Sequence, residues 1–163
     1  MTKDQDVIDD FGKEWSRFQQ VHNLSNQELE RLYQGYFNIF PNELFSRRDL
    51  IGFDMGCGSG RWASFIAPKV EKLFCVDPSV EALKVAKENL SSFTNCEYVC
   101  CTAENFSVPD KSMDFGYSLG VLHHVSNTEK SLINCVRKLK KDAPFLLYLY
   151  YQLENRSFFS NIT

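Results

Sequence analysis

The sequence has 163 residues, enough for one domain with a sizeable core. Its 44% hydrophobic and 24% charged content is ordinary for a globular protein. The net charge of −3 provides no overall basic field, which argues against nucleic acid or an anionic membrane as the partner. No apolar run approaches the ~20 residues of a membrane-spanning helix, and the polar, acidic start has no signal-peptide pattern.

The cysteines show no metal-binding pattern. They include no C-x-x-C pair and no matching histidine spacing, which argues against a zinc site. Several lie inside apolar runs, where a free thiol behaves as a small hydrophobic side chain. We therefore expect a reduced, cytoplasmic protein with no bound metal. The cysteines are Cys57, Cys75, Cys96, Cys100, Cys101 and Cys135.

Two aromatic-rich helices are predicted before the first strand. Residues 4–20 carry aromatic side chains at roughly helical spacing. A capping-box pattern, S-x-x-E, at residues 25–28 opens the second helix, and its apolar residues recur at helical spacing. Pro41 is expected to end this helix at or just before Phe40.

From residue 49 onward, apolar runs alternate with helical patterns. One helix is predicted over residues 60–67, stopped by Pro68, and another starts near Pro78. A second capping-box pattern at residues 126–129 opens a third helix. Continuous apolar strands separated by helices predict a parallel sheet covered on both faces. The predicted strands are residues 49–54, 70–77, 96–101, 113–119 and 144–151.

The first predicted strand ends in Asp54 and runs into Gly56, Gly58 and Gly60. Because glycine tolerates positive φ and lets a ligand contact the backbone, this loop is predicted to fold tightly around a ligand. The start of a helix after it would favour the polar end of a nucleotide-like molecule. Dinucleotide-binding loops have the spacing G-x-G-x-x-G, and Arg61 occupies the third glycine place, which argues against a nicotinamide dehydrogenase.

In such a sheet, ligands lie beyond the carboxyl ends of the strands. The second predicted strand ends in Asp77, about 20 residues after the glycines, where a carboxylate can accept hydrogen bonds from ribose hydroxyls. Alternatively, Asp77 only caps the next helix. The third strand ends in C-T-A-E at residues 101–104, and the fourth ends in S-L-G, followed by His123 and His124.

Together these segments resemble a known family. Residues 53–60, 75–80, 102–104 and 113–125 are similar, in order, to the ligand-contacting segments of class I S-adenosylmethionine-dependent methyltransferases, in the subgroup with L-H-H-V after the fourth strand. The resemblance covers residues 49–150. It implies a Rossmann-like three-layer α/β/α sandwich with a mostly parallel sheet of order 3-2-1-4-5. It also implies S-adenosylmethionine as cofactor and S-adenosylhomocysteine as product.

The resemblance further implies a role for each strand end. The glycine loop holds the methionine end of the cofactor, with Asp54 beneath it, and Asp77 takes the ribose hydroxyls. Residues 102–104 border the adenine, and Leu119 and Gly120 line the sulfonium side. The implied cofactor-binding residues are Asp54, Gly56, Cys57, Gly58, Gly60, Asp77, Pro78, Thr102, Ala103, Glu104, Leu119 and Gly120.

His124 and His123 are the candidate catalytic residues. A histidine near the methyl group can act as general base for an oxygen or nitrogen nucleophile. Alternatively, the pair only borders the site. The N-terminal segment is similar to the lid of small-molecule methyltransferases, so Trp15, Phe18 and Tyr36 are predicted to contact the acceptor.

The resemblance divides this single domain into a helical lid, residues 1–45, a cofactor-binding core, residues 46–151, and a tail, residues 152–163. A class I sheet normally continues with a helix and two further strands, 6 and 7, which this sequence lacks. The apolar fifth strand would then lie at a sheet edge, where it is prone to pair with another chain. We expect that the chain is a shortened piece of a longer enzyme, that the tail covers this edge, or that a homodimer does.

The sequence thus predicts transfer of the methyl group of S-adenosylmethionine to an oxygen, nitrogen or carbon of a small-molecule acceptor. The alternative is a non-catalytic module that binds S-adenosylmethionine or S-adenosylhomocysteine, or a truncated, inactive methyltransferase fragment. A nicotinamide dehydrogenase ranks third. Neither nucleic acid nor a membrane is expected as a partner.

Overall fold

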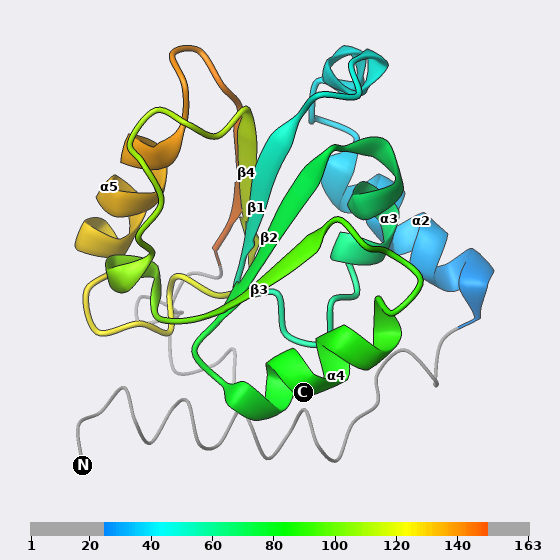
Figure 1. Ribbon diagram of the computed structural model, residues 1–163, viewed down its shortest axis with the longest axis horizontal. Coiled ribbons are helices and arrows are strands. Elements are labelled where there is room, and N and C mark those ends of the chain that lie inside the picture. Colours follow the sequence, from blue (N-terminus) through cyan, green and yellow to red (C-terminus); the bar gives the residue numbers. More distant parts are fainter. Residues whose placement is uncertain (1–24, 150–163) are drawn as a thin grey trace, which may run out of the picture.

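A five-stranded sheet forms the centre of the computed structural model, which describes residues 25–149 (Figure 1). The strands are β1 (Ile51–Met55), β2 (Lys72–Asp77), β3 (Cys96–Cys100), β4 (Phe115–Leu119) and β5 (Phe145–Tyr148). Their order is β3-β2-β1-β4-β5, and every neighbouring pair is parallel. The predicted sheet order is therefore confirmed.

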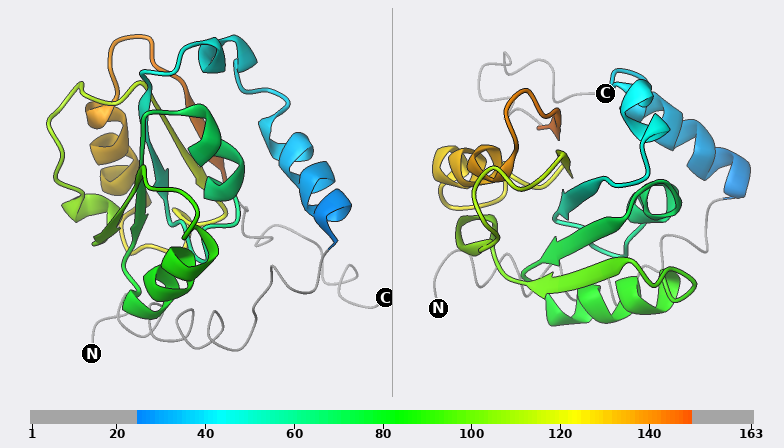
Figure 2. Two further views of the ribbon diagram at one scale, coloured as in Figure 1. Left: turned by 45° about the vertical axis from the view of Figure 1, so that its right-hand side comes forward. Right: turned by 45° about the horizontal axis from the view of Figure 1, so that its top comes forward.

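Helices cover both faces of this sheet. They are α2 (Asn26–Phe37), η1 (Asn42–Ser46), α3 (Ala63–Ile66), η2 (Ala67–Lys69), α4 (Val80–Asn89), η3 (Ala103–Asn105) and α5 (Thr128–Lys138). The helices α2, α3 and α4 lie on one face of the sheet, and η3 and α5 lie on the other (Figure 2). A hydrophobic core joins each of these layers to the sheet. This is the three-layer sandwich that the sequence predicts.

The inner strands are apolar on both sides because both sides are covered. In β2, Leu73 and Cys75 belong to the core on the α2 side, whereas Phe74 and Val76 belong to the core on the α5 side. Successive side chains of a strand point to opposite faces, so a strand between two helical layers needs apolar residues at every position. That requirement explains the continuous apolar runs in the sequence.

The helix α2 begins with the predicted capping box. The Glu28 N–H donates to Ser25 Oγ at 3.3 Å, and the Ser25 N–H donates to Glu28 Oε2 at 2.8 Å. The helix buries Tyr33 and Phe37 against the sheet face, where Phe37 packs edge-on against Tyr117 at a centroid distance of 5.3 Å. The helix ends at Phe37, somewhat before the predicted end near Phe40. Because Tyr33 and Phe37 pack in the core, α2 is part of it.

Two predicted helix starts are wrong. The helix expected over residues 60–67 is shorter, because turns continue from the glycine loop to Trp62 and α3 begins only at Ala63. The helix α5 starts from Asn127, whose Oδ1 accepts the Lys130 N–H at 2.9 Å, and not from the capping box at 126–129. Asparagine is as good an N-cap residue as serine. Asn127, one residue after Ser126, therefore sets the start of α5.

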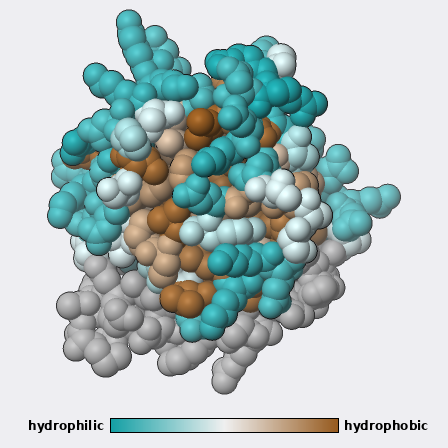
Figure 3. All heavy atoms as spheres, in the orientation of Figure 1, coloured by the Kyte–Doolittle hydropathy of each residue, from teal (hydrophilic) through white to brown (hydrophobic). Residues whose placement is uncertain are grey.

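The strands β3 and β5 lie at the two edges of the sheet. On the face seen in Figure 1, which includes β3, hydrophobic residues lie among polar ones (Figure 3). Within residues 25–149 no strand pairs with the outer edge of β5, and the tail proposed to cover it lies outside the described residues. That covering, by the tail or by a second copy, stays a prediction.

None of the described helices has both the length and the apolar character to span a membrane.

Candidate functional site

A cavity of about 480 Å³ opens at the carboxyl ends of β1, β2 and β4. It brings together strand ends that are far apart in the sequence. Asp54, Gly60 and His123 are not among its lining residues. The predicted cofactor-binding residues that line it are Gly56, Cys57, Gly58, Asp77, Pro78, Thr102, Ala103, Glu104, Leu119 and Gly120.

The loop between β1 and α3 depends on its glycines. Gly56, Gly58 and Gly60 all have positive φ, of 79°, 53° and 76°. A Cβ on Gly56 would stand 2.5 Å from the Val121 side chain, so only glycine fits there. The N–H groups of Gly56 and Cys57 both donate to the Val76 carbonyl, at 2.7 and 3.0 Å. The loop is therefore fixed against β2 and forms one wall of the cavity.

The Asp77 carboxylate accepts two backbone hydrogen bonds in this wall. Its Oδ2 accepts the Gly58 N–H at 3.0 Å and its Oδ1 accepts the Ser79 N–H at 2.9 Å. Burial raises the pKa of the Asp77 carboxyl, and these two donors oppose the rise. Ser79, and not Asp77, caps α4, because Ser79 Oγ accepts the Ala82 N–H at 3.2 Å. Asp77 thus holds the glycine loop to β2, and a carboxylate oxygen can still accept a second hydrogen bond from a ligand.

Asp54 lies in the core beneath the loop and is only 2% exposed. It is paired in the sheet with Tyr117 on one side and Cys75 on the other. Burial raises the pKa of the Asp54 carboxyl well above its ordinary value, and the Tyr117 hydroxyl opposes the rise. Because Asp54 does not line the cavity, its direct contact with a cofactor remains a prediction from the resemblance.

The helix η3 forms another part of the cavity wall. Thr102 is its N-cap residue, Ala103 is buried, and both line the cavity together with Glu104 and Asn105. The Glu104 carboxylate pairs with Lys130 Nζ of α5 at 2.7 Å. Since the Lys130 side chain is 68% exposed, this pair adds little stability.

The two adjacent histidines differ in position. Their ring centroids are 3.9 Å apart, yet only His124 lines the cavity. Burial lowers the pKa of the His123 ring, and the neighbouring His124 lowers it further. Of the two predicted catalytic residues, His124 is therefore the one placed to meet a bound molecule.

Tyr36 of α2 lies where two cavities meet. A second cavity, of about 790 Å³, lies between α2 and β5, and Tyr36, Leu119 and Tyr148 line both cavities. The Tyr36 ring packs edge-on against Trp62 at 5.3 Å and against Tyr148 at 5.1 Å. The other predicted acceptor contacts, Trp15 and Phe18, lie outside the described residues.

Sequence reasoning missed part of the lining. Ser59, Arg61 and Trp62 follow from their position in the glycine loop, which is a signal that the sequence contains. Ser131 and Tyr148 come from α5 and β5, and no sequence pattern connects them to the loop. The lining residues that were not predicted are Met55, Ser59, Arg61, Trp62, Ser79, Asn105, Val121, Leu122, Val125, Ser126, Ser131 and Tyr148.

The sheet order, the glycine loop and the cavity at the strand ends are those of the class I S-adenosylmethionine-dependent methyltransferase fold. The model of the methyltransferase domain family matches residues 53–147. The chain therefore belongs to that family.

The chain is similar to the uncharacterized methyltransferase YcgJ of Bacillus subtilis, with 33% identity over 108 residues, which is 63% of this chain and 41% of YcgJ. The crystal structure of YcgJ superposes with a TM-score of 0.60 at 27% identity, covering 66% of this chain and 50% of that one. A malonyl-[acyl-carrier protein] O-methyltransferase of Marinomonas is 33% identical over 67 residues, 40% of this chain and 25% of that protein. The chain thus spans at most half of each of these relatives.

Proposed function

We propose that this chain binds S-adenosylmethionine in the 480 Å³ cavity and transfers its methyl group to an oxygen, nitrogen or carbon of a small molecule. The observation that carries the proposal is the meeting of the glycine loop, Asp77 and η3 around one cavity. Gly56 supports the fit, because a side chain at this position would clash with Val121, which also lines the cavity, and would disturb the cavity wall.

The residues of the chain would bind the cofactor at three places. The loop around Gly58 would hold the methionine end, Asp77 would accept from the ribose hydroxyls, and Ala103 would lie against the adenine. The sulfonium of the bound cofactor makes its methyl group electrophilic. The task of the protein is then to align the acceptor and exclude water, and such orientation supplies on the order of 7–11 kcal/mol.

The acceptor would approach from the side of Tyr36. Because Tyr36, Leu119 and Tyr148 line both cavities, a molecule in the larger one reaches the cofactor cavity at these three residues. His124 lines the cofactor cavity and would take a proton from an oxygen or nitrogen acceptor. The proposed acceptor is therefore a small molecule held between α2 and β5, next to the end of β4.

The second candidate function is cofactor binding without catalysis. It is favoured by the site itself, because the residues that line the cavity would hold the cofactor whether or not an acceptor is bound. In that case the 480 Å³ cavity still binds S-adenosylmethionine or S-adenosylhomocysteine. Binding and turnover are therefore tested separately, and binding comes first.

Calorimetric titration tests the binding step. S-adenosylhomocysteine and NAD are titrated separately into the 163-residue chain and into the variant Asp77→Ala. The matched control is Asp110→Ala, which also loses one carboxylate. Asp110 is bonded to Arg137 and Lys138, not to the glycine loop, so it reports the loss of a carboxylate elsewhere. We expect binding of S-adenosylhomocysteine in the micromolar range that is lost only in Asp77→Ala. Binding of NAD in its place, or of neither ligand by the folded chain, would refute the proposal.

A further inference from the structure

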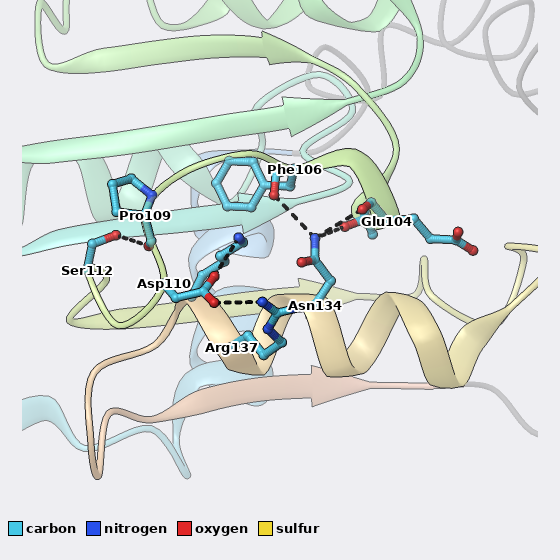
Figure 4. Close-up of polar contacts among 9 residues, drawn as sticks. Glu104, Phe106, Pro109, Asp110, Ser112, Asn134 and Arg137 are labelled. Carbon is cyan, nitrogen blue, oxygen red and sulfur yellow. Dashed lines mark hydrogen bonds and ion pairs between the residues drawn. The ribbon is translucent and has the colours of Figure 1, made fainter.

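Asn134 of α5 connects this helix to the wall of the cavity. It does not line the cavity itself. Its side-chain Nδ2 donates to the carbonyl oxygens of Ala103 at 2.7 Å, Phe106 at 3.2 Å and Glu104 at 3.3 Å (Figure 4). The two N–H groups of this amide are thus shared among the carbonyls of Ala103 and Glu104 in η3 and of Phe106, which follows it.

The helix η3 needs such support because it is a single short turn. Its three residues have one backbone bond to the preceding loop, from the Asn105 N–H to the Thr102 carbonyl at 3.0 Å. The last carbonyls of any helix have no partner within it, and a single turn does not hold its own conformation. The Asn134 amide donates to the carbonyls of Ala103 and Glu104 in this turn and of Phe106 after it, so a contact from α5 holds η3 in its orientation at the cavity.

A second contact from α5 shows that the two elements meet along one helix face. Lys130 precedes Asn134 by one helical turn, and its Nζ reaches Glu104 Oε2 at 2.7 Å. That ion pair involves an exposed lysine and is screened by water. The Asn134 amide, with three backbone acceptors, is therefore the stronger constraint on the turn.

We propose that Asn134 is a positioning residue for base recognition: by fixing η3 it orients the backbone of Ala103 toward the adenine ring and so sets the selectivity of the site for adenine. The inference rests on the proposed cofactor binding. Asn134 acts through the turn, without touching the ligand. Loss of its amide should therefore weaken ligands with an adenine more than ligands with an altered base.

The test uses two ligands that differ only in the base. S-adenosylhomocysteine and S-inosyl-homocysteine, in which hypoxanthine replaces adenine, are titrated into the 163-residue chain and into the variants Asn134→Ala and Asn134→Gln. Arg137→Ala is the matched control, because Arg137 lies in the same helix and bonds Asp110 at 2.8 Å instead of η3. Amide hydrogen exchange of residues 102–106 without ligand reports the turn directly.

We expect Asn134→Ala to bind S-adenosylhomocysteine about tenfold more weakly, while S-inosyl-homocysteine changes by no more than about twofold. Residues 102–106 should exchange faster in this variant, Arg137→Ala should match the parent chain in all three measurements, and Asn134→Gln, which keeps the amide, should recover part of the preference.

Two results would overturn the inference: equal losses for both ligands in Asn134→Ala, or unchanged exchange of residues 102–106. If the parent chain binds neither ligand, the proposed function fails, and the adenine role of Asn134 fails with it. The exchange data would then still show whether Asn134 fixes the turn. The failure of the proposed function and the failure of the positioning role of Asn134 are therefore distinguished.

Discussion

Phe115 of β4 lies over Gly52 of β1, its partner in the sheet, so closely that a Cβ on Gly52 would stand 2.2 Å from the ring. The next pair reverses this arrangement on the other face, where a Cβ on Gly116 would stand 2.3 Å from the ring of Phe53. Each ring fills the space of the side chain that its glycine partner lacks. The two pairs therefore fix the register of β1 against β4, and with it the strand ends that form the cavity.

Gly116→Ala is expected to destabilise the protein by about 1–3 kcal/mol, because the added methyl group forces the buried Phe53 ring out of its position. The measurement is urea unfolding of the variant and the parent chain. Gly35→Ala is the control: nothing lies within 4 Å of its added Cβ, and Gly35 lies in the exposed part of α2. Alanine should stabilise the helix there by about 0.5–1 kcal/mol. A neutral Gly116→Ala would show that the sheet can adjust.

Asp54→Asn is expected to remove a loss of stability that the parent chain suffers as the pH rises. Above the ordinary value of 3.8, an unfolded Asp54 has lost its proton, whereas the buried carboxyl with its raised pKa keeps it. The folded state therefore binds more protons, and the free energy of unfolding falls by about 1.4 kcal/mol for each pH unit between the unfolded and the folded pKa. Urea unfolding at pH 4.5, 6 and 7.5 should show the advantage of Asp54→Asn growing with pH.

Asp110→Asn should change the pH dependence of stability in the opposite direction in the same experiment. Hydrogen bonds from Lys138 and Arg137 lower the pKa of Asp110, so its contribution is present above the ordinary pKa and is lost as the pH falls through the folded one. This variant should lose stability at neutral pH and approach the parent chain in acid. If both variants responded to pH alike, the assignment of the Asp54 effect to burial would be wrong.

Gly56→Ala is expected to weaken binding of S-adenosylhomocysteine at least about tenfold, because alanine disfavours the positive φ at this position by about 1–2 kcal/mol and meets Val121. The double variant Gly56→Ala with Val121→Ala removes the clash and leaves the φ strain. It should recover part of the affinity in the same titration. Full recovery would mean that the clash alone shapes the loop, and no loss at all would exclude the loop from the site.

His124→Ala is expected to slow methyl transfer about 10²-fold or more if the acceptor reacts through a protonated oxygen or nitrogen, while leaving affinity for S-adenosylhomocysteine within about twofold. The measurement is release of S-adenosylhomocysteine in the presence of an acceptor found by screening. His123→Ala is the matched control, because His123 does not line the cavity. An equal effect of both variants would mean that the pair only supports the loop after β4.

The sequence by itself determined the sheet and the position of the site. The apolar runs are continuous because each inner strand packs against helices on both faces, as Leu73 and Phe74 show. The three glycines mark a loop whose positive φ values other residues disfavour. These are local requirements of backbone and burial, so they are visible along the chain. Helix starts are less certain locally, because neighbouring residues such as Ser126 and Asn127 compete for the same cap.

Only the tertiary structure decided which side chains meet at the cavity. Asn134 reaches the carbonyl of Ala103 across 31 positions of sequence, and nothing in its local pattern indicates this bond. His124 lines the cavity and its neighbour His123 does not. Tyr36 contacts Tyr148, which is distant from it in the sequence. Such contacts depend on how whole elements pack across the sheet, and the packing angle of a helix fixes side-chain positions that residue spacing leaves open.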